Sequence, residues 1–210
     1  MPVLSRTFEE LVTAARELVP DQGRRVLGIT GAPGSGKSTI AARLVEALGP
    51  AAVSLPMDGF HLANAELVRL GRRDRKGAPD TFDALGYVAL LQRLRQPGPG
   101  VVYAPVFDRR LEEALAGALP VPADTPLVVT EGNYLLLDQP PWSLVRPLLD
   151  EAWYLEIDDT LRVERLVNRH VAHGKEPAGA REWVLRSDES NARLIAGSRA
   201  RADLVVSPAP

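Results

Sequence analysis

A glycine-rich segment between a strand-like run and a helix-like pattern constrains this chain more than any other feature. Residues 24–30 read RRVLGIT, and residues 31–39 read GAPGSGKST just as a helix-like pattern begins. The spacing G-x-x-x-x-G-K-S in this context is the signature of a phosphate-binding loop. Glycines let the backbone curl so that successive N–H groups point at one centre, and the following helix adds its N-terminal dipole. An ordinary glycine-rich turn is the weaker interpretation, because it does not account for these flanks.

The predicted loop implies a nucleoside triphosphate and Mg²⁺ as ligands. Lys37 would reach the β- and γ-phosphates, and the Ser38 hydroxyl would bind Mg²⁺. None of the lysines, Lys37, Lys76 and Lys175, is followed two residues later by the aspartate of a guanine-recognition segment, so ATP is favoured over GTP. The residues predicted to bind the nucleotide are Gly31, Ala32, Pro33, Gly34, Ser35, Gly36, Lys37, Ser38 and Thr39.

Short apolar runs and helix-like patterns alternate along the chain, which predicts an α/β fold. Strands are expected at 24–30, 51–55, 101–104, 127–130, 153–157 and 204–206. Helices are expected at 8–19, 38–48, 63–70, 83–95, 111–119, 143–149, 160–173 and 181–202, with a charged loop at 71–81. Such alternation favours a parallel sheet covered by helices on both faces, with ligands at the carboxyl ends of the strands.

Composition narrows the function classes. The 210 residues fit one domain, 1–210, and contain no cysteine, which excludes disulfides, thiolate catalysis and zinc–cysteine sites. With a net charge of −2, the chain lacks the excess of basic residues that is typical of nucleic-acid-binding proteins. No apolar run approaches the roughly 18 residues of a membrane span, and residues 1–22 predict an amphipathic helix rather than a signal peptide. We therefore expect a cytoplasmic protein without nucleic-acid or membrane partners; a homodimer is compatible with the sequence.

Two carboxylates follow expected strands and are candidates for chemistry. Asp58 follows the strand at 51–55 and could accept a proton from an attacking hydroxyl; the alternative is an Asx turn, since Asp-Gly is a common turn pair. Glu131 follows LVVT and could hold Mg²⁺ through water. Its alternative is an ordinary charged residue in a loop after a strand.

The helix expected at 160–173 carries arginines on one face. Arg162, Arg165 and Arg169 recur at i, i+3 and i+7, so they share a side of the helix. Such arginines could close over a transferring phosphate as a small lid at about 160–180. The alternative is a solvated face with ordinary ion pairs.

Several segments together resemble a known group of enzymes. They read GITGAPGSGKST, PMDGFH, RKGAPDTFD, YAPVFDR, TEGNYLLL and RHVAHGK. In this order and spacing, they resemble the P-loop kinases of the uridine kinase, pantothenate kinase and phosphoribulokinase group. The likeness is strongest to bacterial uridine-kinase-like proteins, some of them labelled fructose-transport-system kinases. It implies a five-stranded parallel sheet in the order 2-3-1-4-5 with a small lid.

The resemblance also implies roles for individual residues. Asp58 matches the base that takes the proton of the acceptor hydroxyl, Glu131 matches the acidic residue of the third strand, and Arg165 acts in catalysis with Asp58 and Lys37. Arg75 or Lys76 is expected near the acceptor, and Asp108 falls within an acceptor-contacting segment. The residues expected to bind the acceptor are Asp58, His61, Asp83, Tyr103, Phe107, Arg109, Arg169 and Lys175.

The expected activity is phosphoryl transfer from ATP to a hydroxyl group of a small metabolite. A nucleoside is the first expectation for the acceptor, and pantothenate or a sugar is the second. A P-loop ATPase or nucleotide-dependent regulator without a small acceptor is the alternative from another class.

Overall fold

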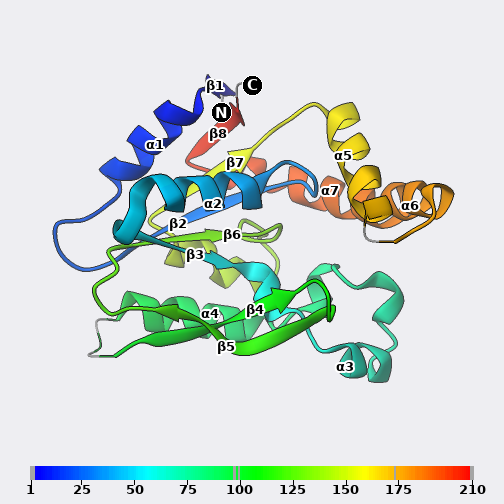
Figure 1. Ribbon diagram of the computed structural model, residues 1–210, viewed down its shortest axis with the longest axis horizontal. Coiled ribbons are helices and arrows are strands. Elements are labelled where there is room, and N and C mark those ends of the chain that lie inside the picture. Colours follow the sequence, from blue (N-terminus) through cyan, green and yellow to red (C-terminus); the bar gives the residue numbers. More distant parts are fainter. Residues whose placement is uncertain (1–2, 97, 99, 173, 209–210) are drawn as a thin grey trace.

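The computed structural model describes residues 3–96, 98, 100–172 and 174–208. Their main sheet has six strands, all paired in parallel, in the order β1-β8-β7-β2-β6-β3 (Figure 1). The strands are β1 (Leu4–Arg6), β2 (Arg25–Gly31), β3 (Ala52–Pro56), β6 (Leu127–Glu131), β7 (Glu151–Leu155) and β8 (Leu204–Pro208). A parallel α/β sheet is therefore confirmed, whereas the expected sheet of five strands is wrong, because β1 adds a sixth strand beyond β8 and so changes the order of the whole sheet. The added strand, β1, is short and exposed at the sheet edge, so its sequence lacks the buried apolar run that marks the others.

Two apolar cores cover the two faces of the sheet. Helices α1 (Phe8–Glu17) and α2 (Lys37–Leu48) pack on one face, whereas α4 (Ala84–Arg95) and α7 (Glu189–Ala196) belong to the core on the other (Figure 1). Thr7 and Glu10 form a capping box that starts α1, which satisfies N–H groups that a helix leaves free. The expected N-terminal helix thus begins at Phe8.

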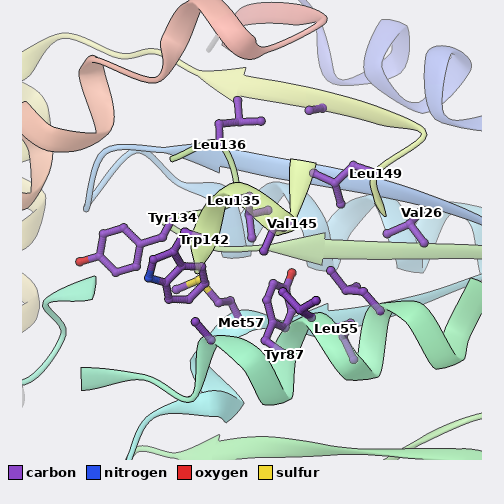
Figure 2. Packing of buried hydrophobic residues seen from close by; sticks show 14 of the residues in the cluster. Val26, Leu55, Met57, Tyr87, Tyr134, Leu135, Leu136, Trp142, Val145 and Leu149 are labelled. Carbon is purple, nitrogen blue, oxygen red and sulfur yellow. The ribbon is translucent and has the colours of Figure 1, made fainter. Parts of the chain in front are cut away.

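The core on the α4 and α7 side of the sheet holds the backbone in place beside the two predicted carboxylates, Asp58 and Glu131. Figure 2 shows Met57 packed near Tyr134 and Trp142, whose ring centroids lie 5.4 Å apart. The Tyr87 hydroxyl lies 2.6 Å from the Thr130 hydroxyl, which donates to the Leu55 carbonyl at 2.7 Å. These buried contacts hold the ends of β3 and β6 in register immediately before the two carboxylates.

A separate hairpin corrects one expected helix. Strands β4 (Val102–Asp108) and β5 (Glu113–Val121) pair antiparallel, so β4 is longer than expected and the helix at 111–119 is wrong. Alanine and leucine in this segment favour a helix locally. The fold instead places Gly117 at φ 68° and pairs the segment with β4, so tertiary pairing overrides local propensity.

The C-terminal part contains the helices expected to form a lid. We define the lid as α5 (Asp159–Ala172) and α6 (Pro177–Trp183); His173, the last residue of the expected helix, lies outside the described residues. A π-helix, Val184–Asp188, interrupts the helical region between α6 and α7. The remaining helices are α3 (Asn64–Arg69) and the 3₁₀ turns Gly49–Ala51, Met57–Phe60, Arg73–Arg75, Pro79–Thr81, Trp142–Leu144, Arg146–Leu148 and Arg199–Arg201. None of the helices in the described ranges is long and apolar enough to cross a membrane.

Candidate active site

A cavity of about 430 Å³ lies where the phosphate-binding loop, the ends of β3 and β6, the hairpin and the lid come together. Its wall includes Lys37 and Ser38 from the loop, Asp58 after β3 and Glu131 at the end of β6. Parallel strands end at one edge of the sheet, so residues distant in sequence meet there. The cavity therefore joins the predicted nucleotide site to the two carboxylates.

The loop has the backbone shape that phosphate binding requires. Gly34 and Gly36 adopt φ values of 83° and 92°, and Gly36 stands at the N-cap of α2. This left-handed backbone suits glycine and lets N–H groups turn inward at a helix N-terminus. A Cβ on Gly34 would also lie 2.9 Å from the Arg162 carbonyl oxygen, so the lid helix rests directly on the loop.

Lys37 is a buried cation whose surroundings suit an anionic ligand. Its side chain is 7% exposed, and its Nζ donates to the Ala32 carbonyl at 3.1 Å. Burial lowers the pKa of Lys37 to about 8, against the charges of Glu131 and Asp58, which raise it. A polyphosphate in the loop would place negative charge beside this ammonium and offset the cost of its burial.

Ser38 and Glu131 form an oxygen pair that fits Mg²⁺. The Ser38 hydroxyl donates to Glu131 Oε1 at 2.9 Å. Burial and then the charge of Asp58 raise the pKa of Glu131 to about 6, whereas Lys37 and Ser38 lower it. No group of three or more metal-binding side chains is found in the part of the chain that the structure describes. This pair suits a hard cation that takes its remaining ligands from phosphate and water, as Mg²⁺ does.

Asp58 presents its carboxylate to the cavity. Its carboxylate Oδ2 lies 3.5 Å from Nη2 of Arg109, and its side chain is 34% exposed to the cavity. No backbone N–H of the described residues donates to this carboxylate, so the Asx-turn interpretation is wrong. The Asp58 carbonyl lies 2.7 Å from Nδ1 of His61, which fixes the backbone while the carboxylate stays available.

Three aromatic rings form one wall of the cavity. The His61 ring centroid lies 4.0 Å from that of Phe82 and 4.7 Å from that of Phe107. Burial lowers the pKa of His61, against the charge and the carbonyl of Asp58. His61, Phe107 and Arg109 thus reach the cavity as expected, and Phe82 is an additional member.

Other residues expected to bind the acceptor or to lie near it are not part of the wall of this cavity. Asp83 Oδ1 accepts from Gly86 N–H at 2.8 Å and caps α4, a role that its position before a helix could have indicated. Tyr103 lies on β4 with 58% of its surface exposed. Asp108 closes the hairpin turn by accepting from backbone N–H groups, and Arg75 pairs with Asp80.

The lid arginines occupy three different environments. Arg162 is 2% exposed and pairs with Glu189 at 2.5 Å and with Asp159 at 2.9 Å, so it joins the lid to α7 and does not face solvent. Arg169 reaches the cavity wall. Arg165 is exposed outside that wall, with Nη1 4.0 Å from a Cβ built on Gly36. The spacing predicts that the three arginines share one face of the helix, but packing of the helix places them in different surroundings.

The lid also contributes residues to the cavity wall, and the sequence pattern predicts only some of them. Lys175 lines the cavity as expected, with Nζ 4.5 Å from the ring centroid of Trp183. His170 Nε2 lies 3.0 Å from Asp188 Oδ2, which joins α5 to the π-helix. His170 and Lys175 lie within the segment RHVAHGK, whereas Trp183 and Asp188 belong to no predicted motif, so only their position in the fold reveals them.

Comparisons with known proteins agree with this architecture. The Phosphoribulokinase / Uridine kinase family profile matches residues 26–210. The Schizosaccharomyces pombe protein "Putative uridine kinase C227.14" is 33% identical over 211 residues, which cover 95% of this chain and 90% of that protein. Escherichia coli K12 YggC is 35% identical over 199 residues, covering 92% of this chain and 81% of its own length.

A solved structure extends the likeness to three dimensions. The crystal structure of the "putative fructose transport system kinase" from Silicibacter sp. TM1040 is 39% identical and superposes with a TM-score of 0.88. The match covers 96% of this chain and 99% of that one. The resemblance expected from the motifs is therefore confirmed: this chain belongs to the phosphoribulokinase/uridine kinase family and is an ATP-dependent small-molecule kinase.

Proposed function

We propose that this kinase transfers the γ-phosphoryl group of ATP to a hydroxyl group of a small metabolite, with Asp58 as the general base. The observation that carries the proposal is the position of the Asp58 carboxylate, which shares one cavity with Lys37 and Ser38 of the loop. A carboxylate free of backbone N–H donors, opposite a phosphate site, can both orient an alcohol and accept its proton.

The transfer would use the residues of this chain as follows. As the acceptor oxygen bonds to the γ-phosphorus, Asp58 takes the hydroxyl proton while the bond to the departing ADP oxygen breaks. Lys37 compensates negative charge on the phosphates, and Arg165 and Arg169 extend this compensation from the lid. Ser38 and Glu131 would hold Mg²⁺, which when bound neutralises phosphate charge. We infer that α5, packed on Gly34, keeps water from the transferring group.

The acceptor expected first from the sequence, a nucleoside, stays a prediction. The aromatic wall could contact a base, but Phe82 and Phe107 both pack against His61, and Lys76 Nζ lies 5.0 Å from the Phe107 ring centroid. These rings therefore present less open stacking surface than their number indicates. A sugar or a pantothenate-like alcohol fits the polar remainder of the wall equally well.

Acceptor-dependent ADP release tests the proposal. Purified protein would be mixed with Mg·ATP and, in turn, with nucleosides, pantothenate, hexoses and phosphorylated sugars. We expect at least one hydroxyl compound to raise ADP release well above the basal rate and to yield one phosphorylated product per ADP. Rapid hydrolysis that no acceptor stimulates would instead favour the ATPase alternative.

A further inference from the structure

The charged segment before α4 contributes two cationic side chains to the cavity wall, and its other two cationic side chains pair with an aspartate of the same segment. Arg72 and Arg75 both pair with Asp80, at 3.4 Å and 2.5 Å. Arg73 and Lys76 instead line the cavity. For the Arg73 guanidinium, no ion pair or hydrogen bond is found among the residues that the structure describes. Within the described part of the chain, the segment thus presents a cation without a protein partner to the cavity in which we propose that the acceptor binds.

Lys76 is held in place from two sides. Its Nζ donates to Asn64 Oδ1 at 2.8 Å and to the Glu112 carbonyl at 2.5 Å, and it lies over the Phe107 ring. Glu112 has φ 54°, a conformation that non-glycine residues rarely adopt. Strain of this kind persists where the surroundings enforce it, often at binding sites. Here the strained turn positions the carbonyl that fixes Lys76.

Two carboxylates accompany this pair of cations, and one of the two lines the cavity. Burial is the main cause that lowers the pKa of Lys76, and the charge of Arg73 lowers it further, whereas Glu112 and Glu113 raise it. The Glu113 carboxylate also accepts the backbone N–H of Asn64 at 3.0 Å. Glu112 is the carboxylate of this group that lines the cavity, so it can offset one of the two cations.

The nucleotide phosphates can be bound without these two cations, because other groups of the cavity suit them. The phosphate-binding loop supplies Lys37 and its backbone N–H groups, and Arg169 and Lys175 reach the cavity from the lid. Arg73 lines the same cavity as Lys76, which lies over the Phe107 ring; Phe107 in turn packs on His61, next to Asp58. A molecule bound along this wall would have one end at Arg73 and Lys76 and the other at Asp58.

We propose that Arg73 and Lys76 bind a carboxylate or phosphate group of the acceptor, so that the substrate of this kinase is a negatively charged alcohol. The inference rests on the proposed function and narrows its substrate class. Charge-assisted hydrogen bonds from a guanidinium and an ammonium would anchor the anionic end and turn a hydroxyl toward Asp58. Neutral nucleosides and free sugars lack the group that this pair recognises.

Matched pairs of acceptors test the inference. Each pair differs in the anionic group: a hexose 6-phosphate against the hexose, glycerate against glycerol, and pantothenate against its alcohol, panthenol. We expect the charged member of at least one pair to have the higher kcat/KM by at least about 10-fold, the lower range for hydrogen bonds to charged groups. The phosphate and carboxylate pairs together show which anion is preferred.

Arg73→Gln provides the residue-level test, because Arg73 holds no other part of the fold in place. We expect this variant to raise KM for the charged acceptor about 10- to 100-fold while kcat and KM for ATP change little. The matched control is Arg110→Gln, since Arg110 lies on the nearby hairpin with its side chain 92% exposed and outside the cavity wall. The control should leave all three constants unchanged.

The outcomes separate this inference from the proposed function. Higher kcat/KM for the neutral members, or an unchanged KM for the charged acceptor in Arg73→Gln, would overturn the anion site and leave the kinase intact. Acceptor-independent hydrolysis across every pair would overturn the proposed function and this inference with it.

Discussion

Replacing Gly34 with alanine should destabilise the protein more than the same replacement at Gly36, because only Gly34 touches the lid backbone. Both glycines have left-handed backbone conformations. Placing alanine in this region costs about 1–2 kcal/mol at either position. Gly36→Ala is therefore a matched control that carries the backbone strain without the contact.

The difference between the two variants follows from what each added methyl group would meet. At Gly34 it would lie 2.9 Å from the Arg162 carbonyl oxygen and 2.9 Å from Leu166 Cγ. At Gly36 the nearest atom is Nη1 of Arg165, at 4.0 Å, which is the end of a flexible side chain. Because the helix backbone cannot yield alone, α5 must shift, and overpacking of this kind costs about 1–3 kcal/mol.

Thermal unfolding of the ligand-free variants measures this difference. At about 2–4 °C per kcal/mol for a chain of this size, Gly34→Ala should melt about 2–12 °C below Gly36→Ala. Circular dichroism at neutral pH is sufficient, provided that unfolding is reversible. Equal melting temperatures would refute the packing of α5 against the phosphate-binding loop.

Other perturbations address the charged groups of the site. Lys37→Met should abolish turnover while the protein stays folded by circular dichroism; normal turnover would refute the phosphate-site assignment. Arg165→Ala should lower kcat more than it weakens ATP binding, because a lid arginine acts on charge that develops during transfer; an unchanged kcat would leave Arg165 an ordinary surface charge. The folded-state pKa of Glu131, about 6, lies above its unfolded value, so its stabilising contribution is present below about pH 4.5 and is lost as the pH rises through about 6. The melting temperature of the wild type relative to Glu131→Gln should therefore fall between about pH 4.5 and about pH 6, and a pH-independent difference would contradict this.

The elements whose chemistry is local were predictable from the sequence. The phosphate-binding loop needs glycines, a lysine and a hydroxyl residue at fixed spacing, and the adjoining β2 and α2 appear as expected. The buried strands β6 and β7 are also marked by runs of apolar residues. In each case neighbouring residues in the sequence decide the outcome.

Features that depend on distant partners were not predictable. The segment of β5 becomes a strand because β4 pairs with it, although its alanines and leucines favour a helix. Arg162 is buried because α5 packs on the loop, which helical spacing does not show. Arg73 belongs to a segment that predicts only a charged loop, and its place at the cavity follows from how Asp80 engages its neighbours.

The kcat of Asp58→Asn tests the central claim most directly. Asparagine keeps the size of the side chain but cannot accept the proton of the acceptor hydroxyl. We expect kcat to fall roughly 10²–10⁴-fold, the range for loss of a positioned general base. ATP affinity should change little, because the loop is intact, and the melting temperature should hold, since the Asp58 carboxylate accepts no backbone N–H among the described residues. Full kcat in this variant would contradict the assignment of Asp58 as the base and the account of phosphoryl transfer built on it.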